Sequence, residues 1–424
     1  MEGNMAKIII IGGGWAGCAA AVTAKKTGTE VLLIERTDLL LGLGNVGGIM
    51  RNNGRFTAAE EAIAMGAGEL FEITDSCSTH QNVAFPGHAH ASFYNPEGVE
   101  PAVRKCLADM GIEIRMATRI TGVDTEENRI RTITSAEEEV FDADVFVDCT
   151  GTTGPMGNCM EFGNGCSMCV LRCPSFGPRV SISAKAGGFD YFGLRDDGTP
   201  GAFSGSCKLD KASLSGELQE KLCKDGVAIV PLPKHFIQQG KLDKKVCRQY
   251  ALPQFAENII LIDTGHAKMM TPFFPLEELR QVPGFEKARF LDPYAGGKGN
   301  SIRYMAITER DDCLRVKGVK NLFCAGEKAG PFIGHTEAIV TGSLAGYNAG
   351  LMARGEGKLV KPPAEPTAIG AFLNYEKPGG GMFTFAGDAF FDRMKEKGLY
   401  TTERAVIRRR IEDAGLTNIY NAFL

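Results

Sequence analysis

The sequence predicts an α/β fold in which a discontinuous nucleotide-binding domain of the Rossmann type is interrupted by an inserted mixed α+β domain. Three segments support this prediction. A β-branched run at 8–11 leads into a glycine cluster, a strand-like run at 144–148 leads into Cys-Thr-Gly, and a short run at 321–324 leads into Ala-Gly-Glu. Because the third segment lies far beyond the other two, we expect the chain to leave the nucleotide-binding domain and later return to it.

Composition places the chain among globular proteins with a large buried core. Of its 424 residues, 44% are hydrophobic and 23% are charged, close to the averages for such proteins. The net charge of −4 gives no sign of a strongly basic surface and leaves RNA binding undecided. The apolar stretch 8–22 is too short to cross a bilayer and is interrupted by glycines. We therefore expect a soluble, cytoplasmic protein with no membrane span.

The first glycine cluster has the spacing of a dinucleotide-binding turn. The sequence at 12–17 is G-x-G-x-x-G, and it lies between a strand-like run and a run of good helix formers. Gly12 allows a tight turn, Gly14 lets backbone N–H groups approach a pyrophosphate, and Gly17 lets the helix pack closely on the strand. The helix N-terminus then faces the phosphate charge. The residues of this turn predicted to bind the cofactor are Gly12, Gly14, Trp15, Ala16 and Gly17.

An acidic residue follows the second predicted strand, Val31–Ile34. Glu35 stands where the carboxylate of a Rossmann unit accepts hydrogen bonds from an adenosine ribose, and Arg36 comes next. A chance glycine-rich turn would not bring a strand, a helix and a carboxylate into this register. The sequence therefore predicts a bound dinucleotide, with Glu35 and Arg36 among its contacts.

The two later segments favour FAD over NAD. In glutathione-reductase-like flavoproteins, segments of the form seen at 144–151 and 321–327 close the first FAD lobe and return the chain to the flavin end of the cofactor. A helix pattern rich in small residues, 338–349, follows the second segment. A generic NAD-linked Rossmann protein, which is the alternative, does not require this C-terminal return. The predicted FAD contacts in these segments are Thr150, Gly151, Gly326, Glu327 and Gly334.

A glycine-rich loop at 42–48 follows the second strand. It lies where such flavoproteins wrap the pyrophosphate and the flavin, so we expect backbone contacts to the cofactor from Asn45, Gly47 and Gly48. The alternative is a flexible loop without a binding role.

Histidines supply the candidates for proton transfer. His335 and Glu337 lie in the predicted FAD-returning segment, where they could touch the flavin or the substrate. His335 is the first candidate because an imidazole titrates near neutrality, and a helix cap is the alternative. His88 and His90 have a spacing compatible with metal binding on a strand. Without a matching carboxylate pattern, we expect them to lie on a substrate-facing loop or on the surface.

Several of these motifs together resemble the GidA/TrmFO group of FAD proteins. The glycine turn, segment 321–349 and the stretches 366–372 and 382–385 resemble most closely its folate- and FAD-dependent tRNA (uracil-5-)-methyltransferase branch. The resemblance implies an FAD fold with an inserted substrate domain, and a flavin and two cysteines that transfer a folate-borne methylene to a tRNA uracil. It suggests Cys207 as one of these cysteines, whereas the other falls in 42–48, where no cysteine stands. We expect the fold to carry over, but not automatically the reaction.

A cysteine cluster is the main departure from that group. Its last three cysteines and Pro174 match the end of the bacterial ferredoxin motif, C-x2-C-x3-C-P. We expect a [4Fe–4S] site, with a redox-active dithiol, structural zinc or ordinary buried thiols as alternatives. Because no second G-x-G-x-x-G is followed by a helix, electrons would enter from ferredoxin through this loop or from NAD(P)H stacked on the flavin. The predicted ligands are Cys159, Cys166, Cys169 and Cys173.

These observations divide the chain into three parts. Residues 1–155 form the first part of the FAD domain, and 156–314 form the cysteine-rich loop and the inserted substrate domain. Residues 315–424 form the second part of the FAD domain, with C-terminal helices.

The expected function is that of an FAD-dependent oxidoreductase. The flavin would transfer hydride or electrons to or from a small-molecule substrate or a redox partner protein, with His335, Glu337 and Cys207 as candidate catalytic residues. One alternative is a folate-dependent enzyme that modifies a tRNA uracil, and another is a non-catalytic electron carrier. A nucleic-acid partner is not favoured, because the arginines at 404 and 408–410 are more simply a solvated basic helix face.

Overall fold

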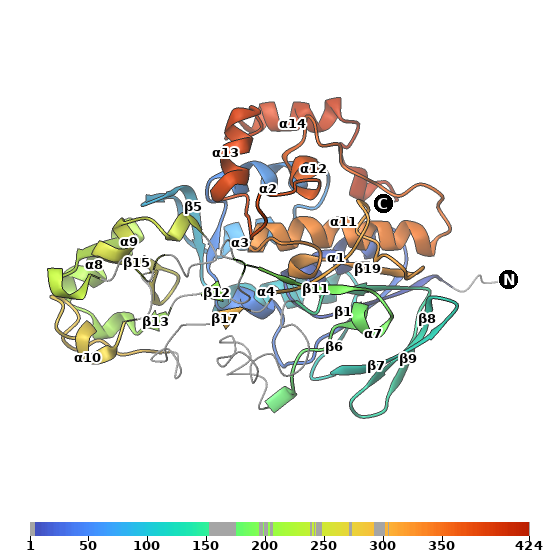
Figure 1. The fold of residues 1–424 in the computed structure, drawn as a ribbon, viewed down its shortest axis with the longest axis horizontal. Helices are drawn as coiled ribbons and strands as arrows, with labels where there is room; N and C mark the ends of the chain where they lie inside the picture. Colours follow the sequence, from blue (N-terminus) through green and yellow to red (C-terminus); the bar gives the residue numbers. More distant parts are fainter. Residues whose placement is uncertain are drawn as a thin grey trace.

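The computed structural model describes residues 5–151, 175–194, 198, 202–203, 207–237, 240, 242, 248–270, 274–291, 302–303 and 305–423. The four predicted cluster cysteines, Cys159, Cys166, Cys169 and Cys173, lie outside this part of the chain. Figure 1 shows a central body, a lobe at one end that contains the inserted residues, and a group of C-terminal helices packed on the body. Within the described residues, no helix is long and apolar enough to cross a membrane.

A five-stranded parallel sheet with the order β19-β10-β1-β2-β6 forms the centre of the body. Its strands are β1 (Lys7–Ile11), β2 (Glu30–Ile34), β6 (Glu113–Arg115), β10 (Val145–Asp148) and β19 (Leu322–Cys324). The β-branched run of β1 is buried, as expected for a strand covered on both faces. Strands β1, β10 and β19 come from the three predicted segments and lie next to one another, which confirms the discontinuous α/β domain.

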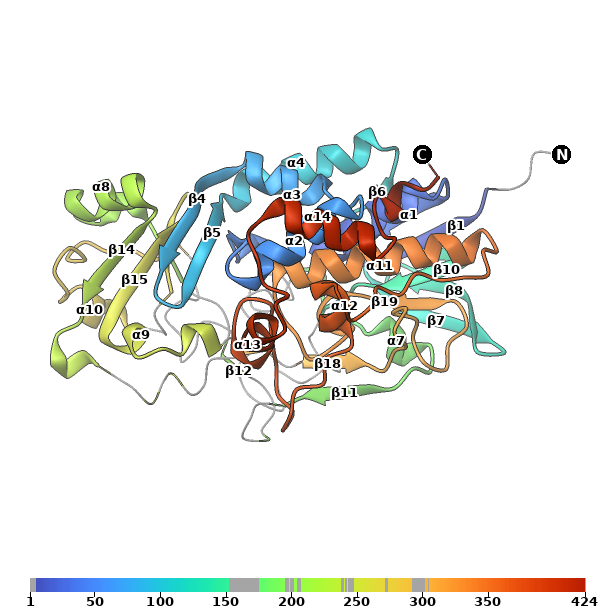
Figure 2. The ribbon, with the colours of Figure 1, turned by 90° about the horizontal axis from the view of Figure 1, so that it is seen from above.

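Helices α1 (Trp15–Lys26) and α11 (His335–Ala353) pack side by side against this sheet (Figure 2). Their contact is made by backbone rather than by large side chains. A Cβ added to Gly342 would lie 2.2 Å from the carbonyl oxygen of Ala16, and a Cβ added to Gly346 would lie 2.1 Å from that of Ala20. The small-residue pattern of α11 therefore brings the two helix backbones into direct contact.

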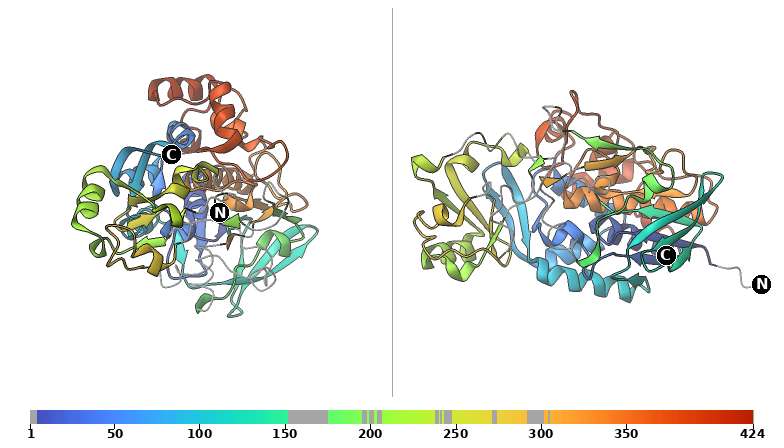
Figure 3. Two further views of the ribbon diagram at one scale, coloured as in Figure 1. Left: turned by 60° about the vertical axis from the view of Figure 1, so that its left-hand side comes forward. Right: turned by 60° about the horizontal axis from the view of Figure 1, so that its bottom comes forward.

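Further elements surround the central sheet. A three-stranded meander at the end of the body far from the insert joins β6 to β10 (Figure 3). The Asn321 side chain fixes it, because Nδ2 donates to the carbonyl of Ile130 (3.0 Å) and Oδ1 accepts from the amide of the same residue (2.9 Å). The elements are α2 (Gly54–Ala64), α3 (Glu69–Ser76), α4 (Pro96–Asp109), β7 (Ile120–Glu126), β8 (Arg129–Ser135), β9 (Val140–Asp142), α7 (Ile182–Lys185), β11 (Asp190–Gly193), β12 (Ala202–Phe203), β17 (Ile302–Arg303) and β18 (Met305–Thr308).

The inserted lobe contains an antiparallel sheet with the order β13-β16-β15-β14. Helix α8 begins where the Ser215 hydroxyl accepts from the amide of Leu218, and it ends at Gly226 in the left-handed conformation (φ +74°). The lobe has its own apolar core, separate from that of the central body. Its elements are β13 (Cys207–Leu209), α8 (Gly216–Asp225), β14 (Val227–Pro231), α9 (Gln254–Glu257), β15 (Asn258–Asp263), β16 (Ala267–Met269) and α10 (Leu276–Leu279).

A second antiparallel sheet, β3-β5-β4, joins the insert to the body. Its strands are β3 (Ile49–Met50), β4 (Ser78–Phe85) and β5 (His88–Tyr94). Its Phe85 and Phe93 share an apolar cluster with Ile260 and Ile262 of β15. The sheet therefore packs with the insert, whereas α2 and α3, which lie between its strands in the sequence, belong to the core of the central body.

The C-terminal segment forms α12 (Ala368–Leu373), α13 (Asp388–Glu396) and α14 (Arg404–Asp413), which pack near α2. The buried Glu61 carboxylate of α2 accepts from the amides of Ala368 (2.8 Å) and Ile369 (2.9 Å) at the start of α12. Two of the C-terminal arginines also have structural partners. Arg404 pairs with Glu60 at 3.0 Å, and Arg410 donates to backbone carbonyls after α13.

Replacing Gly346 with alanine tests the contact between α1 and α11. The added methyl group would collide with the carbonyl oxygen of Ala20, which is backbone and cannot rotate away. We expect the free energy of unfolding to fall by about 1–3 kcal/mol, although alanine is the better helix former. Chemical denaturation measures this change. The control is Gly216→Ala in α8, where a Cβ meets nothing within 4 Å, and equal effects of the two substitutions would contradict the predicted contact.

Candidate functional site

A cavity lies at the carboxyl ends of the central strands, where the first residues of α1 and α11 meet. Ligands of open α/β sheets bind at this edge. Basic side chains in its lining, from Arg36, Arg55, Arg119, Arg179 and Lys268, outnumber the acidic ones, from Glu35 and Glu327. Such a lining suits an anionic ligand. The predicted site residues that line the cavity are Gly12, Gly14, Trp15, Ala16, Glu35, Arg36, Gly47, Thr150, Gly151, Gly326, Glu327, Gly334 and His335.

The three glycines of the first turn have different roles. Gly12 has a φ of +103°, and a Cβ there would lie 2.3 Å from the carbonyl oxygen of Cys149. A Cβ on Gly17 would lie 1.8 Å from the carbonyl oxygen of Gly12, so Gly17 is needed for packing and does not line the cavity. Gly14 lines the cavity, and a Cβ there would meet no protein atom within 4 Å. Its missing side chain therefore leaves room for a ligand rather than for another part of the protein.

The acidic residue after β2 faces this turn. Glu35 is buried and lines the cavity, and its carboxylate accepts from the amides of Gly13 (2.7 Å) and Thr37 (2.8 Å). These bonds hold the carboxylate beside the turn, where it has remaining lone pairs for a ribose hydroxyl. Arg36 also lines the cavity, and its guanidinium donates to the carbonyl of Gly177.

A buried carboxylate shapes the Thr-Gly turn after β10. One oxygen of Asp148 accepts from the amide (3.0 Å) and hydroxyl (2.6 Å) of Thr150. The other accepts from the amide (2.8 Å) and hydroxyl (2.7 Å) of Ser183, at the start of α7. Asp148 thereby fixes Thr150 and Gly151 at the cavity edge.

Lysines from the insert hold the loop at 42–48. Lys208 donates to the carbonyl of Asn45 at 3.0 Å, and Lys268 donates to the carbonyls of Val46 at 2.8 Å and of Gly47. Asn45 and Gly48 do not line the cavity, and the amide nitrogen of Asn45 donates to the carbonyls of Leu40 (2.6 Å) and Gly42 (3.2 Å). The loop therefore contributes Gly42, Leu43, Gly44, Val46 and Gly47 to the cavity, and it is fixed from the insert side.

His335 begins α11 and lines the cavity. Its Nδ1 lies 3.1 Å from the hydroxyl of Tyr94, which donates to the carbonyl of Gly44 at 2.9 Å. Since the Tyr94 proton is used in the second bond, the His335 Nδ1 must be the donor in the first, which places the lone pair of a neutral ring on Nε2. A Cβ on Gly47 would lie 1.6 Å from the ring, so this glycine makes the space for it.

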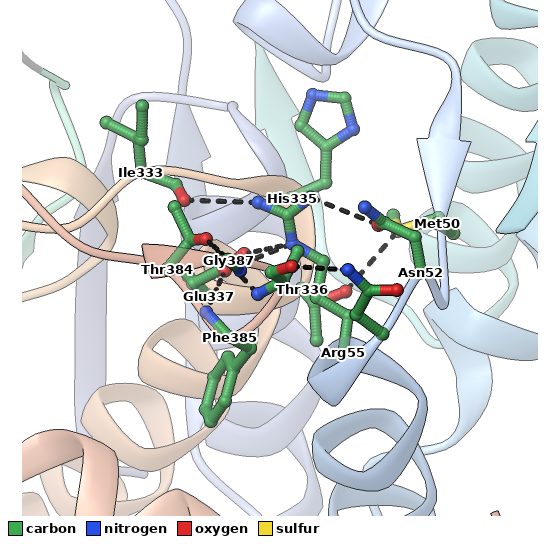
Figure 4. A network of polar contacts seen from close by, with 12 residues as sticks. Met50, Asn52, Arg55, Ile333, His335, Thr336, Glu337, Thr384, Phe385 and Gly387 are labelled. Atoms are coloured by element: carbon green, nitrogen blue, oxygen red, sulfur yellow. Dashed lines mark hydrogen bonds and ion pairs between the residues drawn. The ribbon is translucent and has the colours of Figure 1, made fainter. Parts of the chain in front are cut away.

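Glu337 has a different position from the one expected of a catalytic residue. It does not line the cavity, is 1% exposed, and accepts from Arg55 Nε (3.0 Å) and the amide of Phe385 (2.9 Å). Burial raises the pKa of Glu337, and the Arg55 guanidinium opposes this rise. Figure 4 shows the His335 ring pointing away from this ion pair. The structure thus gives Glu337 a structural role, which ties α11 to α2 and to the C-terminal segment.

Cys207 likewise lies away from the cavity. It is 1% exposed and belongs to the apolar core of the insert, where β13 pairs with β16 opposite Met269. Its candidate role as a redox cysteine beside the flavin is therefore not supported by its position. The described residues contain no group of three or more His, Cys, Asp or Glu side chains that could hold a metal ion.

Sequence reasoning missed part of the lining. Thr118 and Arg119 follow β6, Lys268 comes from β16, and Gln249 and Tyr250 precede α9. None of these residues lies in a motif. A position just after a parallel strand is the only sequence feature that could have indicated a place in the lining, and only Thr118 and Arg119 have it.

Comparisons with known proteins match two separate segments of the chain. The family model for FAD dependent oxidoreductases matches residues 7–154, and that for glucose inhibited division protein A matches residues 265–357. A methylenetetrahydrofolate–tRNA-(uracil-5-)-methyltransferase TrmFO from Moorella thermoacetica is 39% identical over 99 residues, which are 23% of this chain and 21% of the relative. A tRNA uridine 5-carboxymethylaminomethyl modification enzyme MnmG from Acholeplasma laidlawii is 42% identical over 98 residues, which are 23% of this chain and 15% of the relative. The matched stretches thus span about a fifth or less of these relatives.

Solved structures extend the similarity over nearly the whole chain. GidA from Aquifex aeolicus superimposes with a TM-score of 0.66 at 15% identity, covering 97% of this chain and 77% of GidA. A second crystal form of the same protein gives a TM-score of 0.62. At this identity the similarity shows a shared fold, including the insert.

In fold, in the cavity and in the matched segments, the chain is similar to the class of FAD-dependent oxidoreductases. Within that class the protein is GidA/TrmFO-like, as the sequence resemblance predicted. FAD is the cofactor of this class, and the cavity fits it: two helix N-termini, the open space at Gly14 and the Glu35 carboxylate suit a dinucleotide. The comparisons give no support to the expected [4Fe–4S] cluster, or to NAD(P)H or ferredoxin as the donor.

Replacing Gly14 with valine tests where the cofactor lies. Its φ of −66° is open to any residue and no protein atom is near, so we expect the fold to be unaffected. The new side chain would occupy the space that lets backbone amides approach a diphosphate, and FAD affinity should fall at least about 100-fold. Fluorescence titration with FAD measures the affinity. Gly98→Val, at an exposed open site on α4, is the control; unchanged FAD affinity in Gly14→Val would refute this placement.

Proposed function

We propose that the protein holds FAD in this cavity and uses it to modify the C5 position of a uracil in tRNA. The observation that carries the proposal is that relatives of two kinds, TrmFO and MnmG, match the chain, and both printed names describe modification of a tRNA uracil or uridine at position 5. The expectation of an unidentified small-molecule substrate has no such support.

The residues of the central body would bind the cofactor in the order of the sheet. Glu35 would accept hydrogen bonds from the adenosine ribose, and the turn at Gly14 with the N-terminus of α1 would face the diphosphate. Thr150, Gly151 and the segment 326–335, from β10 and β19, would border the rest of the cofactor. When bound and reduced by an external donor such as a nicotinamide nucleotide, FAD would supply the two electrons that a reductive step at C5 requires.

His335 is the residue proposed to move a proton. Its Nδ1–H is held by Tyr94, so Nε2 is the atom that accepts and returns a proton. Substitution at C5 of uracil requires this step, because the carbon that forms the new bond must lose its hydrogen as a proton. Glu337 takes no part in this transfer, because both of its oxygens are bonded within the buried ion pair.

The two-cysteine route of the TrmFO-like branch is not proposed for this chain. The loop at 42–48 has no cysteine, and Cys207 is buried in the core of the insert. The proposal therefore covers C5 modification and leaves the transferred group open between those of the two kinds of relative.

Release of tritium tests this proposal. Unmodified tRNA transcripts labelled at C5 of their uridines should release tritium into water when incubated with the FAD-loaded protein, methylenetetrahydrofolate and reduced nicotinamide nucleotide. Binding of tRNA should also weaken steeply as salt is raised, because phosphate contacts release counterions. A protein that holds FAD but neither releases tritium nor binds tRNA would contradict the proposed function.

Replacing Tyr94 with phenylalanine tests the role of His335. The ring keeps its packing, but the hydrogen bond to Nδ1 is lost, so the two neutral tautomers become closer in energy. We expect tritium release to slow about tenfold or more, while FAD affinity stays within about twofold of the native value. The control is Tyr400→Phe, a tyrosine outside the cavity lining. An unchanged rate in Tyr94→Phe would remove Tyr94 from the mechanism.

A further inference from the structure

Gln249 is a cavity-lining residue whose side-chain amide is unused by the protein. The residue is 6% exposed, and both Oε1 and Nε2 are buried without a hydrogen-bond partner. Burying an amide without partners costs about 1–3 kcal/mol, so groups of this kind are rare unless something else bonds to them. Because Gln249 lines the cavity, a ligand in the cavity can supply the missing partners.

The protein backbone restricts where this amide can lie. A Cβ on Gly387 would lie 2.6 Å from Oε1 of Gln249, so the C-terminal segment contacts one side of the amide closely. A Cβ on Gly87 would lie 2.9 Å from the Gln249 carbonyl oxygen, so the turn between β4 and β5 adjoins the backbone. Gln249 thus lies between the C-terminal segment and the β4–β5 turn, and a side chain at Gly387 or Gly87 would collide with it.

An aromatic stack supports Tyr250, the residue that follows Gln249. Tyr250 also lines the cavity, and its ring lies 4.6 Å from that of His88, which in turn stacks on Phe85 at 4.3 Å. Asn52 donates to Nδ1 of His88 at 2.8 Å, and the oxygen of the same amide accepts from Arg55 at 3.1 Å. Burial lowers the pKa of His88 to about 3, so the ring is neutral and suited to stacking.

The chemistry of a primary amide defines the ligand that fits. The amide oxygen accepts a hydrogen bond, and the adjacent NH₂ group donates one. This pair is complementary to the edge of a ring in which a carbonyl group is next to an N–H group. A cyclic imide has this edge, and a flat ring next to Tyr250 gains favourable ring contact. Two sources of an imide are relevant: a uracil of the substrate and the pyrimidine ring of the flavin.

We propose that Gln249 hydrogen-bonds to the N3–H and an adjacent carbonyl of a uracil and so acts as a specificity-determining residue of the cavity. The assignment to the uracil rather than to the flavin rests on the proposed function and on the origin of the residue. The cofactor-facing residues come from the central body, whereas Gln249 and Tyr250 come from the inserted part of the chain. Uracil with a methyl group on N3 lacks the donor and cannot make the pair.

Ligand binding to the FAD-loaded protein tests this inference. Uridine and N3-methyluridine are titrated separately, with the flavin absorbance difference spectrum as the readout. We expect the native protein to prefer uridine by about tenfold, the value of roughly one hydrogen bond. Gln249→Leu should lose this preference, and Gly387→Ala, whose methyl group would displace the amide, should weaken it. Gln281→Leu, an exposed glutamine outside the cavity lining, should retain it.

Three results would overturn the inference. If Gln249→Leu keeps the preference, or if the native protein shows no uridine-dependent change up to ~10 mM, Gln249 does not bind uracil. If the substitution instead lowers FAD affinity about tenfold or more, or shifts the flavin spectrum before uridine is added, the imide is that of the flavin. A different result would contradict the proposed function without contradicting the role of Gln249. Absence of tritium release from tRNA, with a uridine preference that depends on Gln249, would refute C5 modification and leave the role of Gln249 intact.

Discussion

The close packing of α1 on α11 is the constraint on which the site depends. Both helices begin at the cavity, and the rings of Trp15 and His335 at their first residues lie 6.4 Å apart. Two partial positive charges therefore meet at one place, which suits a dinucleotide with a charged centre. This arrangement requires backbone contact, because a side chain at Gly342 or Gly346 would push α11 away from α1 and move His335 with it.

The inserted part of the chain is coupled to the cavity through the loop at 42–48. Lys208 and Lys268 stand opposite each other in the insert sheet, and both donate to carbonyls of this loop. Gly47 in turn lies against the ring of His335. A movement of the insert would therefore be transmitted to the ring proposed to carry the proton. The fold thus links the part expected to receive the substrate to the chemical centre.

Short sequence motifs predicted those parts of the fold that depend on interactions between residues close together in the chain. The glycine turn, its flanking strand and Glu35 were predictable because each residue type has a backbone or charge requirement at a fixed spacing. The buried position of Glu337 was not predictable, because a sequence does not show that Arg55, far away in the chain, pairs with its carboxylate in the interior. The burial of Cys207 was not predictable either, because it depends on the insert sheet. Gln249 had no signal at all, since its unused amide becomes evident only when its surroundings are known.

Hydrogen bonding separates residues that build the cavity from those available to a ligand. Glu337, Arg55 and Asn52 are linked to one another and to neighbouring backbone, and satisfied networks of this kind hold segments in place. Gln249 has no such partners, and Arg119, also in the lining, keeps a buried Nε without one. A folded protein tolerates the free-energy cost of burying an unpaired polar group where a bound ligand supplies the missing hydrogen bond. The unsatisfied groups in the described lining are therefore the ones available to hydrogen-bond a ligand, while Glu337 holds in place the helix that carries His335.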